Sequence, residues 1–280
     1  MSSESLDLRS THFILTRFNV RGRYYRGDPG DEWLRRRLEL FARYTLPSFR
    51  AQSVRDFRWL VLIDSESPHW FRAKLAELSL GSYEVVEVEG AFDALAAGRI
   101  VRERLATPFV LTTRVDNDDA VARDFVETIQ RAAVSPEQRF INLVDGAQLG
   151  PKGVYQRPYT QNPFITLVEG ARNQLPATVF VKRHFEASKY APVLNLRSSH
   201  PMWLQVVHGG NVLTELVGLR MKARRLTPWF GCEIPCGDGP FEFALDFTLG
   251  AARIAGRLVG GPHRLVELGR ALAARPAQRL

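Results

Sequence analysis

The sequence lacks an uninterrupted apolar run of about 18 residues, the length that a membrane-spanning helix needs. Its longest apolar stretches are broken by charged residues within 241–258 and by the polar and glycine residues at 208–211. Residues 1–10 contain acidic residues and serine but no apolar segment, so we expect no secretory signal there. These absences predict a protein that stays in the cytoplasm.

Cysteine is also scarce, since Cys232 and Cys236 are the only two. Two thiols cannot build a disulfide framework, and a four-residue offset without a second pair does not match a zinc motif. We therefore expect structural rather than redox-active cysteines. The sequence shows no Ser-His-Asp or Cys-His signature, and no glycine-rich phosphate loop precedes a helix.

The basic character of the chain is confined mainly to its end. Residues 251–280 contain six arginines and a single acidic residue, Glu267, and so carry +5 of the net charge of +8. The remaining +3 is spread over 250 residues, which argues against a general nucleic-acid surface. Hydrophobic residues make up 45% and charged residues 24% of the sequence, as in an ordinary globular protein.

Strand-like and helix-like segments alternate four times in the first half of the chain. We expect strands at residues 12–20, 57–64, 83–88 and 108–113, and helices at 31–48, 67–81, 94–105 and 121–133. The short apolar run at 57–64 is typical of a strand that is buried on both faces of a parallel sheet. The pattern predicts an α/β fold with a mostly parallel central sheet flanked by helices.

The alternation becomes irregular after about residue 145. We expect further strands at 140–144, 164–168 and 176–181, a helix-like stretch at 211–219, and one or two short helices in the last 30 residues. The sequence therefore predicts one domain over residues 11–245 and a basic, helical C-terminal tail over residues 246–280. Leucines at 265, 268 and 272 recur at helical spacing, so this tail either packs on the body of the protein or lies on an anionic membrane.

An acidic cluster follows the fourth expected strand directly, with carboxylates at Asp116, Asp118 and Asp119. Ligands of open α/β sheets bind at the carboxyl ends of the strands. Three carboxylates within four residues repel one another, and a Mn²⁺ or Mg²⁺ ion would supply the missing counter-charge. Such an ion keeps open positions for phosphate oxygens, which is what a nucleotide-sugar site requires.

Three other interpretations of this cluster have to be weighed. A solvated turn could cap the following helix, with Asp119 placed at the positive end of its dipole. A calcium-binding EF-hand loop is excluded, because it needs glycine where Val121 stands and a helix where a strand precedes. A phosphatase of the haloacid dehalogenase type remains an alternative, although its motif follows a first strand and has Thr or Val at the place of Ala120.

The order of four segments, HFILTRFNV, YTLPSFRAQ, DFRWLVLID and TTRVDNDDA, resembles the rhamnosyltransferase family of GT-A-type glycosyltransferases. The resemblance covers about residues 11–215. It implies a GT-A-like sheet that binds a nucleotide-activated sugar together with a divalent metal. By the same resemblance, Asp116 would contact the ribose or the donor sugar, while Asp118, with Asp119, would hold the metal.

The resemblance also places donor-binding residues at other strand ends. Arg17 and Asn19 close the first strand, where the nucleotide base would lie, and Arg17 could also contact the diphosphate. Arg114 flanks the acidic cluster. Asp64, at the end of the second strand, would contact the base or ribose, or would instead cap the following helix.

Two functional roles are assigned to residues beyond the cluster. His208 precedes a Gly-Gly-Asn segment, and a downstream histidine is a common last metal ligand in GT-A enzymes; the alternative is a histidine satisfied within the core. An inverting transferase needs a carboxylate as catalytic base, and Asp145 and Glu169 each end an expected strand.

The sequence therefore predicts a metal-dependent glycosyltransferase that moves a hexosyl group, with rhamnose suggested by the family name alone. The donor would be a nucleotide sugar and the acceptor a carbohydrate or a lipid-linked glycan, as in polysaccharide biosynthesis. Peripheral contact with the inner face of the membrane through the tail is expected if the membrane interpretation holds. A metal-dependent phosphohydrolase and a non-catalytic nucleotide- or carbohydrate-binding protein are the alternatives.

Overall fold

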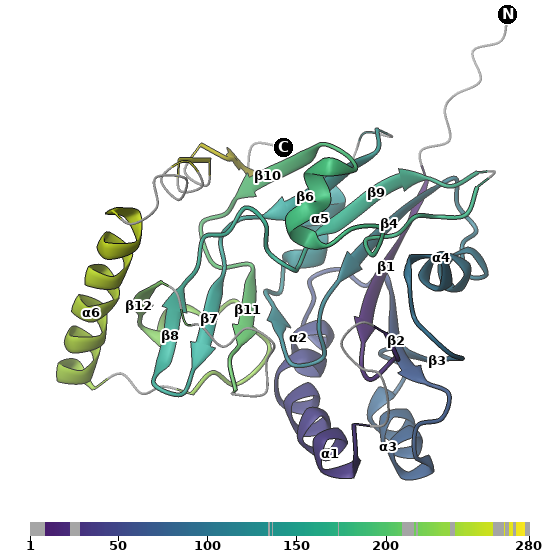
Figure 1. Ribbon diagram of the computed structural model, residues 1–280, viewed down its shortest axis with the longest axis horizontal. Helices are drawn as coiled ribbons and strands as arrows, with labels where there is room; N and C mark the ends of the chain where they lie inside the picture. The colour runs from purple at the N-terminus through teal and green to yellow at the C-terminus, as the bar shows by residue number, and fades with distance from the viewer. Residues whose placement is uncertain are drawn as a thin grey trace, which may run out of the picture.

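The computed structural model describes residues 9–22, 29–133, 135, 137–172, 174–208, 216, 218–235, 239–259, 266, 269–270 and 273–277. It contains two β-sheets that lie side by side, with helices around the larger one (Figure 1). The larger sheet has eight strands in the order β13-β10-β6-β9-β4-β1-β2-β3. Its strands are mostly parallel, and only β9 runs antiparallel to both of its neighbours. The expected α/β class with a mostly parallel sheet is confirmed.

The first half of the chain builds one end of the larger sheet from alternating strands and helices. Its strands are β1 (Ser10–Arg17), β2 (Arg58–Asp64), β3 (Glu84–Val88) and β4 (Phe109–Arg114), and its helices are α1 (Asp31–Leu40), α2 (Leu46–Arg50), α3 (His69–Ser79) and α4 (Ala94–Arg102). Successive residues of β1 point to opposite faces, so Phe13 and Leu15 join one apolar core while Ile14 joins the other. Helices α1, α2 and α3 cover the face of Ile14, and α4 covers the face of Phe13 and Leu15.

The helix expected at 31–48 is one continuous helical segment whose middle is wider than an α-helix. A π-helical turn, η1 (Phe41–Thr45), separates α1 from α2. At its end the backbone N–H of Leu46 donates to the carbonyl of Phe41, five residues earlier. Pro47 follows at once and has no N–H, so the wider turn takes the place of an α-helical hydrogen bond that proline cannot make.

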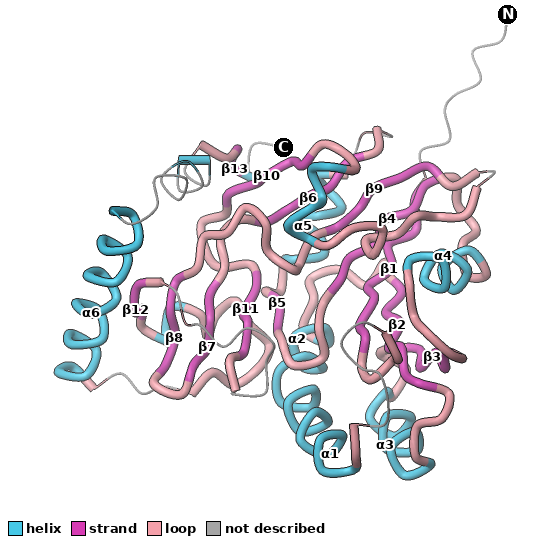
Figure 2. The backbone as a smooth tube through the Cα atoms, in the orientation of Figure 1, coloured by secondary structure: helices cyan, strands magenta, loops and turns pink. Residues whose placement is uncertain are grey.

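The second half of the chain completes both sheets. The strands that it adds to the larger sheet are β6 (Arg139–Leu143), β9 (Thr166–Gly170), β10 (Val193–Arg197) and β13 (Arg275–Pro276). The strands of the smaller sheet are β5 (Ala120–Val121), β7 (Ala147–Gly150), β8 (Gly153–Gln156), β11 (Trp203–Val206) and β12 (Leu219–Met221). The order of strands in the smaller sheet is β12-β8-β7-β11-β5. Figure 2 shows β5 at the inner edge of the smaller sheet, toward the larger one. The short helix α5 (Phe125–Ala132) and the 3₁₀ turns η2 (His184–Lys189) and η3 (Ala223–Arg225) complete this half.

The strand expected at 176–181 is wrong, because this segment is a loop. Its backbone N–H groups bond to side chains instead of to a neighbouring strand. The two carboxylate oxygens of Glu169 accept from Ala177 and Thr178 at 3.0 and 2.9 Å, and the hydroxyl of Thr112 accepts from Val179 at 2.8 Å. Of the helix-like stretch 211–219, residues 211–215 and 217 lie outside the described residues, and Leu219 begins β12.

Helix α6 (Pro240–Val259) stands at the outer edge of the smaller sheet (Figure 1). It packs against β12, and its Asp246 accepts a hydrogen bond from the Tyr155 hydroxyl of β8 at 3.3 Å. The boundary expected at 245/246 falls inside this helix. Leu265, Leu268 and Leu272 of the expected tail helix lie outside the described residues. Within the described part of the chain, no helix is long and apolar enough to cross a membrane.

Candidate functional site

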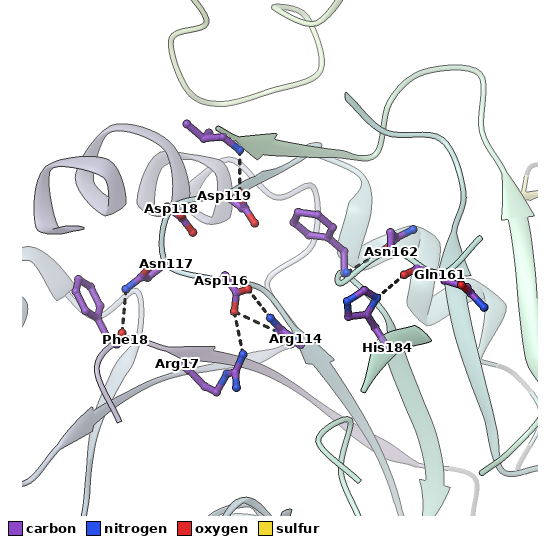
Figure 3. Close-up of polar contacts among 12 residues, drawn as sticks. Arg17, Phe18, Arg114, Asp116, Asn117, Asp118, Asp119, Gln161, Asn162 and His184 are labelled. Carbon is purple, nitrogen blue, oxygen red and sulfur yellow. Dashed lines mark hydrogen bonds and ion pairs between the residues drawn. The ribbon is translucent and has the colours of Figure 1, made fainter. Parts of the chain in front are cut away.

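The acidic cluster lies where the chain leaves the larger sheet and enters the smaller one. Strand β4 ends at Arg114, and β5 begins at Ala120, directly after Asp119. The loop between them turns tightly, with the N–H of Asp119 bonded to the carbonyl of Asp116. The side chain of Asn117 donates to the carbonyl of Phe18, which attaches the loop to the end of β1 (Figure 3). Two sheets therefore position the cluster.

Asp116 lies between two arginines that come from the ends of adjacent parallel strands. Arg114 donates to it from Nη2 at 2.6 Å and from Nε at 3.2 Å, and Nη2 of Arg17 lies 3.6 Å away (Figure 3). Burial by itself raises the pKa of Asp116, but the charges of Arg114 and Arg17 outweigh burial and hold this pKa well below its usual range. Asp116 is therefore an anion with two cations beside it.

Asp118 is bound to residues from two distant parts of the chain. Its Oδ2 contacts Nη1 of Arg37 on α1, and it lies 2.9 Å from Nε2 of His208, which follows β11. Nη1 of Arg37 is also 3.0 Å from Nε2 of His208. The three side chains are between 5% and 13% exposed, so they form a triad that water reaches only in part.

Asp119 faces the smaller sheet. Its Oδ1 accepts a hydrogen bond from the backbone N–H of Val206 at 2.9 Å (Figure 3). Burial, followed by the nearby charges of Asp118 and Asp116, raises the pKa of Asp119 well above its usual value. The three carboxylates therefore differ: Asp116 is paired to arginines, Asp118 faces Arg37 and His208, and Asp119 has a raised pKa and bonds to the backbone of the smaller sheet.

The other residues expected to bind a donor lie at neighbouring strand ends. Asn19 donates to the hydroxyl of Ser67 at 2.9 Å and accepts from the N–H of Asp64 at 3.3 Å. Asp64 in turn accepts from Nε of Arg21 at 2.5 Å. Because β1 lies between β2 and β4, these groups and Arg17 occupy the same edge of the sheet as the cluster. Arg21 is thus part of this edge as well.

The two acids expected to act as a base occupy opposite edges. β9 runs antiparallel to both β4 and β6, so the carboxyl ends of β4 and β6 share one edge. Asp145 follows β6 at this edge and accepts from Nε of Arg197 at 2.7 Å and from the N–H of Ser198 at 2.8 Å. Glu169 pairs with the start of β4, and its carboxylate holds the 176–181 loop. The structure does not bring Glu169 to the cluster, which argues against its expected role as the base.

Sequence reasoning missed two residues near the cluster. Arg37 lies between Leu34 and Leu38 on the buried face of α1. The helical spacing of these residues by itself indicates that the Arg37 side chain faces the protein interior. His184 lies beyond Arg114 in Figure 3, with its Nδ1 bonded to the carbonyl of Gln161. Burial lowers the pKa of His184, with the charge of Arg114 contributing, so its imidazole is neutral near pH 7.

A cavity of about 420 Å³ opens beside His208. Its walls come from α1 and η1, the β7–β8 turn, and the segment after β11, and they are mostly apolar: Leu40, Tyr44, Leu149, Pro151, Val206 and Val207. Lys152 and His208 are its basic lining residues. The cavity has the size and apolar lining of an ordinary small-molecule pocket.

The geometry of Asp118 and His208 fits a divalent cation. Mn²⁺ and Mg²⁺ bind oxygen and nitrogen ligands about 2.1 Å away at near right angles, which separates neighbouring ligand atoms by about 3 Å. Oδ2 of Asp118 and Nε2 of His208 are 2.9 Å apart. Among the described residues, however, no three or more His, Cys, Asp or Glu side chains converge as a metal site. Asp118 and His208 would therefore need ligands from a bound molecule.

Cys232 lies apart from this chemistry. It is buried and forms no disulfide, and burial raises the pKa of its thiol to about 11. Cys236 lies outside the described residues.

Comparison with protein families decides the class of the protein. Residues 28–218 match the family described as "Putative rhamnosyl transferase". The chain belongs to this family. It is thus a member of a glycosyltransferase family, as the resemblance of its first segments implied, and the match includes every candidate residue of the site except Arg17, Asn19 and Arg21.

Comparisons with solved structures and with curated proteins are less informative than the family match. This family member is similar to TarS of S. aureus, residues 1–349, with 10% identity and a TM-score of 0.42 over 70% of this chain and 60% of TarS 1–349. The same TarS segment in complex with UDP-GlcNAc gives 11% identity and a TM-score of 0.40, over 72% of this chain and 60% of that one. The match thus spans less than two thirds of the TarS segment. No curated protein matches the sequence.

Proposed function

We propose that this protein is a glycosyltransferase that moves a hexosyl group from a nucleoside diphosphate donor to a carbohydrate acceptor and uses Mn²⁺ or Mg²⁺ to do so. Rhamnose is the sugar that the family name suggests. The observation that carries the proposal is the convergence of Asp118 and His208, from segments 90 residues apart, beside an edge rich in arginine. Carboxylate and imidazole groups that can hold a cation, together with guanidinium groups that can bind phosphates, are the set that a metal-bound diphosphate needs.

In this proposal, residues at different strand ends bind different parts of the donor. Asn19 and Asp64 would face the base or ribose, because they occupy the ends of β1 and β2. Arg17 and Arg114 would contact the diphosphate, where planar guanidinium groups can each make paired hydrogen bonds. Asp116 holds these two arginines in place, and on leaving it for the phosphates they would free it to accept from a hydroxyl of the ribose or sugar.

Asp118 and His208 would hold the cation, with Asp119 beside them. A cation bound there supplies charge that offsets the negative charge developing on the departing diphosphate. Asp119 would act mainly through its bond to Val206, which fixes the loop against the smaller sheet.

The acceptor would occupy the cavity beside His208. Apolar walls that include Tyr44 suit the C–H faces of a sugar ring, while Lys152 suits an anionic or hydroxyl-rich group. Asp145 is the better of the two expected bases, since it shares the edge of the cluster. Its bonds to Arg197 and Ser198 would have to loosen when the acceptor hydroxyl arrives.

The tail is proposed to contact an anionic membrane, where lipid-linked acceptors reside. The described part of α6 supports this, because Phe241, Leu245, Phe247 and Leu249 are exposed and Arg253 lies on the same helix. Apolar side chains next to basic ones are typical of helices that lie in a lipid interface.

The release of nucleoside diphosphate, measured with and without acceptor, tests the proposed reaction. Nucleotide sugars that raise the melting temperature in the presence of Mn²⁺ would first identify the donor, because a bound donor stabilises the folded state by mass action. A transferase then releases nucleoside diphosphate mainly when an acceptor is present. Release of inorganic phosphate would instead indicate the phosphohydrolase, and binding without turnover would indicate the non-catalytic alternative.

A further inference from the structure

We propose that Arg37 occupies the place of the cation in the donor-free protein, so that the metal enters only together with the donor diphosphate. This inference rests on the proposed function, because it assigns Asp118 and His208 as the ligands of the cation. It adds a residue that no motif indicated and an order of binding that the transferase reaction does not require.

The contacts of Arg37 are those that a metal would make. Its Nη1 contacts Oδ2 of Asp118 and lies 3.0 Å from Nε2 of His208. The same two atoms, 2.9 Å apart, are the pair that fits neighbouring positions around an octahedral cation. A positively charged nitrogen and a divalent cation cannot both lie between them, so the two compete directly.

The surroundings keep Arg37 in this position. Its helix is anchored by the buried Leu34 and Leu38, and its guanidinium lies 5.2 Å from the ring centre of Trp33. Arg36, the preceding residue, donates from Nη2 to the backbone carbonyl of His208 at 2.7 Å. The triad is largely shielded from water, where the repulsion between a guanidinium and an incoming cation is only weakly screened.

Binding of the donor can remove the competition between Arg37 and the cation. Asp118 and His208 offer too few protein ligands for tight binding of a bare ion, since no larger cluster exists among the residues that the structure describes. A diphosphate brings both the missing oxygen ligands and a new anionic partner for Arg37. Arg37 can then exchange Asp118 for a phosphate oxygen while the cation takes its place, which couples metal binding to donor binding.

Titration of the donor-free protein with Mn²⁺ tests the inference, with the electron paramagnetic resonance signal of free Mn²⁺ as the readout. We expect weak binding by the wild type and at least tenfold tighter binding by Arg37→Gln, because glutamine removes the competing charge. Arg37→Lys retains a cation and should stay closer to the wild type. Adding His208→Ala to Arg37→Gln should abolish the gain.

Arg35→Gln is the matched control, because it removes the same charge from the exposed side of the same helix. Mn²⁺ affinity that is unchanged or weaker in Arg37→Gln, with a cooperative thermal transition showing that the variant is folded, would overturn the inference. An equal gain in Arg35→Gln would also overturn it, since the effect would then be general electrostatics.

The failure of the inference and that of the proposed function are distinguishable. The proposed function is tested by Mn²⁺-dependent binding of ADP, GDP, CDP, UDP or dTDP to the wild type, and by sugar transfer. If one of these nucleotides binds with Mn²⁺ while Arg37→Gln shows no gain without nucleotide, the metal-dependent donor site stands and the Arg37 inference fails. If none binds and no sugar is transferred, the proposed function fails as well.

Discussion

Nε2 of His208 lies 2.9 Å from Oδ2 of Asp118, although 90 residues separate them in the chain. Strand β5 makes this approach possible, because it continues directly from the acidic loop and pairs antiparallel with β11, the strand that leads to His208. Two residue pairs, Val121 with Trp203 and Ala120 with Leu204, set the register. The loop and the histidine are therefore fixed to each other by backbone hydrogen bonds as well as by side chains.

Replacing His208 by alanine should reduce the Mn²⁺-dependent affinity for the nucleoside diphosphate by about tenfold or more, the scale expected when metal ligation is disturbed. Isothermal titration with and without excess EDTA measures this. The metal-free melting temperature should fall only slightly, by the loss of the bond to Asp118. If the loss of affinity is the same in EDTA, His208 is a structural residue and the ligand assignment is wrong.

Asp118→Asn should reduce kcat/KM by about a thousandfold or more, since a lost cation removes several kcal/mol of transition-state stabilisation. The free energy of unfolding should fall by less than about 3 kcal/mol, the low end for a buried ion pair that loses one partner, because the lost attraction to Arg37 is opposed by relief of repulsion from the neighbouring carboxylates. Urea denaturation measures the second quantity. Full donor affinity in the presence of EDTA in the wild type would contradict the metal-dependent mechanism.

The burial of His12 predicts that the stability of the protein falls as the pH decreases, independently of the candidate site. It is buried in β1 beside the hydroxyl of Thr113, at 2.7 Å, and burial lowers its pKa to about 3. The unfolded chain binds a proton at this residue below about pH 6.5, while the folded protein does not until about pH 3. Because the unfolded state binds more protons in this window, stability falls as pH decreases through it, by up to about 1.4 kcal/mol per pH unit.

Urea denaturation between pH 7 and pH 5 compares the wild type with His12→Gln. Other groups contribute to both proteins, so the difference between their slopes isolates His12. We expect a shallower slope in the variant, whatever its stability at pH 7. Parallel slopes would mean that His12 binds its proton over the same pH range in the folded and the unfolded protein.

Gly146→Ala should destabilise the protein by about 1–3 kcal/mol through overpacking. A methyl group at this position would lie 2.0 Å from the ring of Trp203. That ring cannot move easily, because it stacks on Phe164 with ring centres 5.0 Å apart and donates from Nε1 to the carbonyl of Leu143 at 2.8 Å. Gly256→Ala is the control, since nothing lies within 4 Å of its added methyl group. Equal effects of the two substitutions on the melting temperature would contradict the packing argument.

Deleting residues 259–280 should weaken sedimentation with anionic liposomes, because it removes most of the arginines of the basic tail. Neutral liposomes serve as the control, and binding to the anionic ones should also fall with rising salt. Unchanged binding after the deletion, or no binding by the intact protein, would show that the tail does not contact the membrane.

The local pattern of the sequence determined much of the first half of the fold. Short apolar strands alternating with amphipathic helices can form only a sheet that is covered on both faces, and the cluster at 116–119 had to fall at a strand end. The family resemblance likewise rested on contiguous segments. These features depend on residues close together in the chain, so their physical preferences can be read directly.

Only the tertiary structure decided which distant groups meet. The smaller sheet arises from short strands whose pairing depends on long-range register rather than on strong local preference. Both Glu169 and Asp145 end strands expected from the sequence, yet the antiparallel direction of β9 places Glu169 at the other edge. Arg37 carried a charge on a buried helix stripe without any visible partner, because its partners, Asp118 and His208, lie 81 and 171 residues further along.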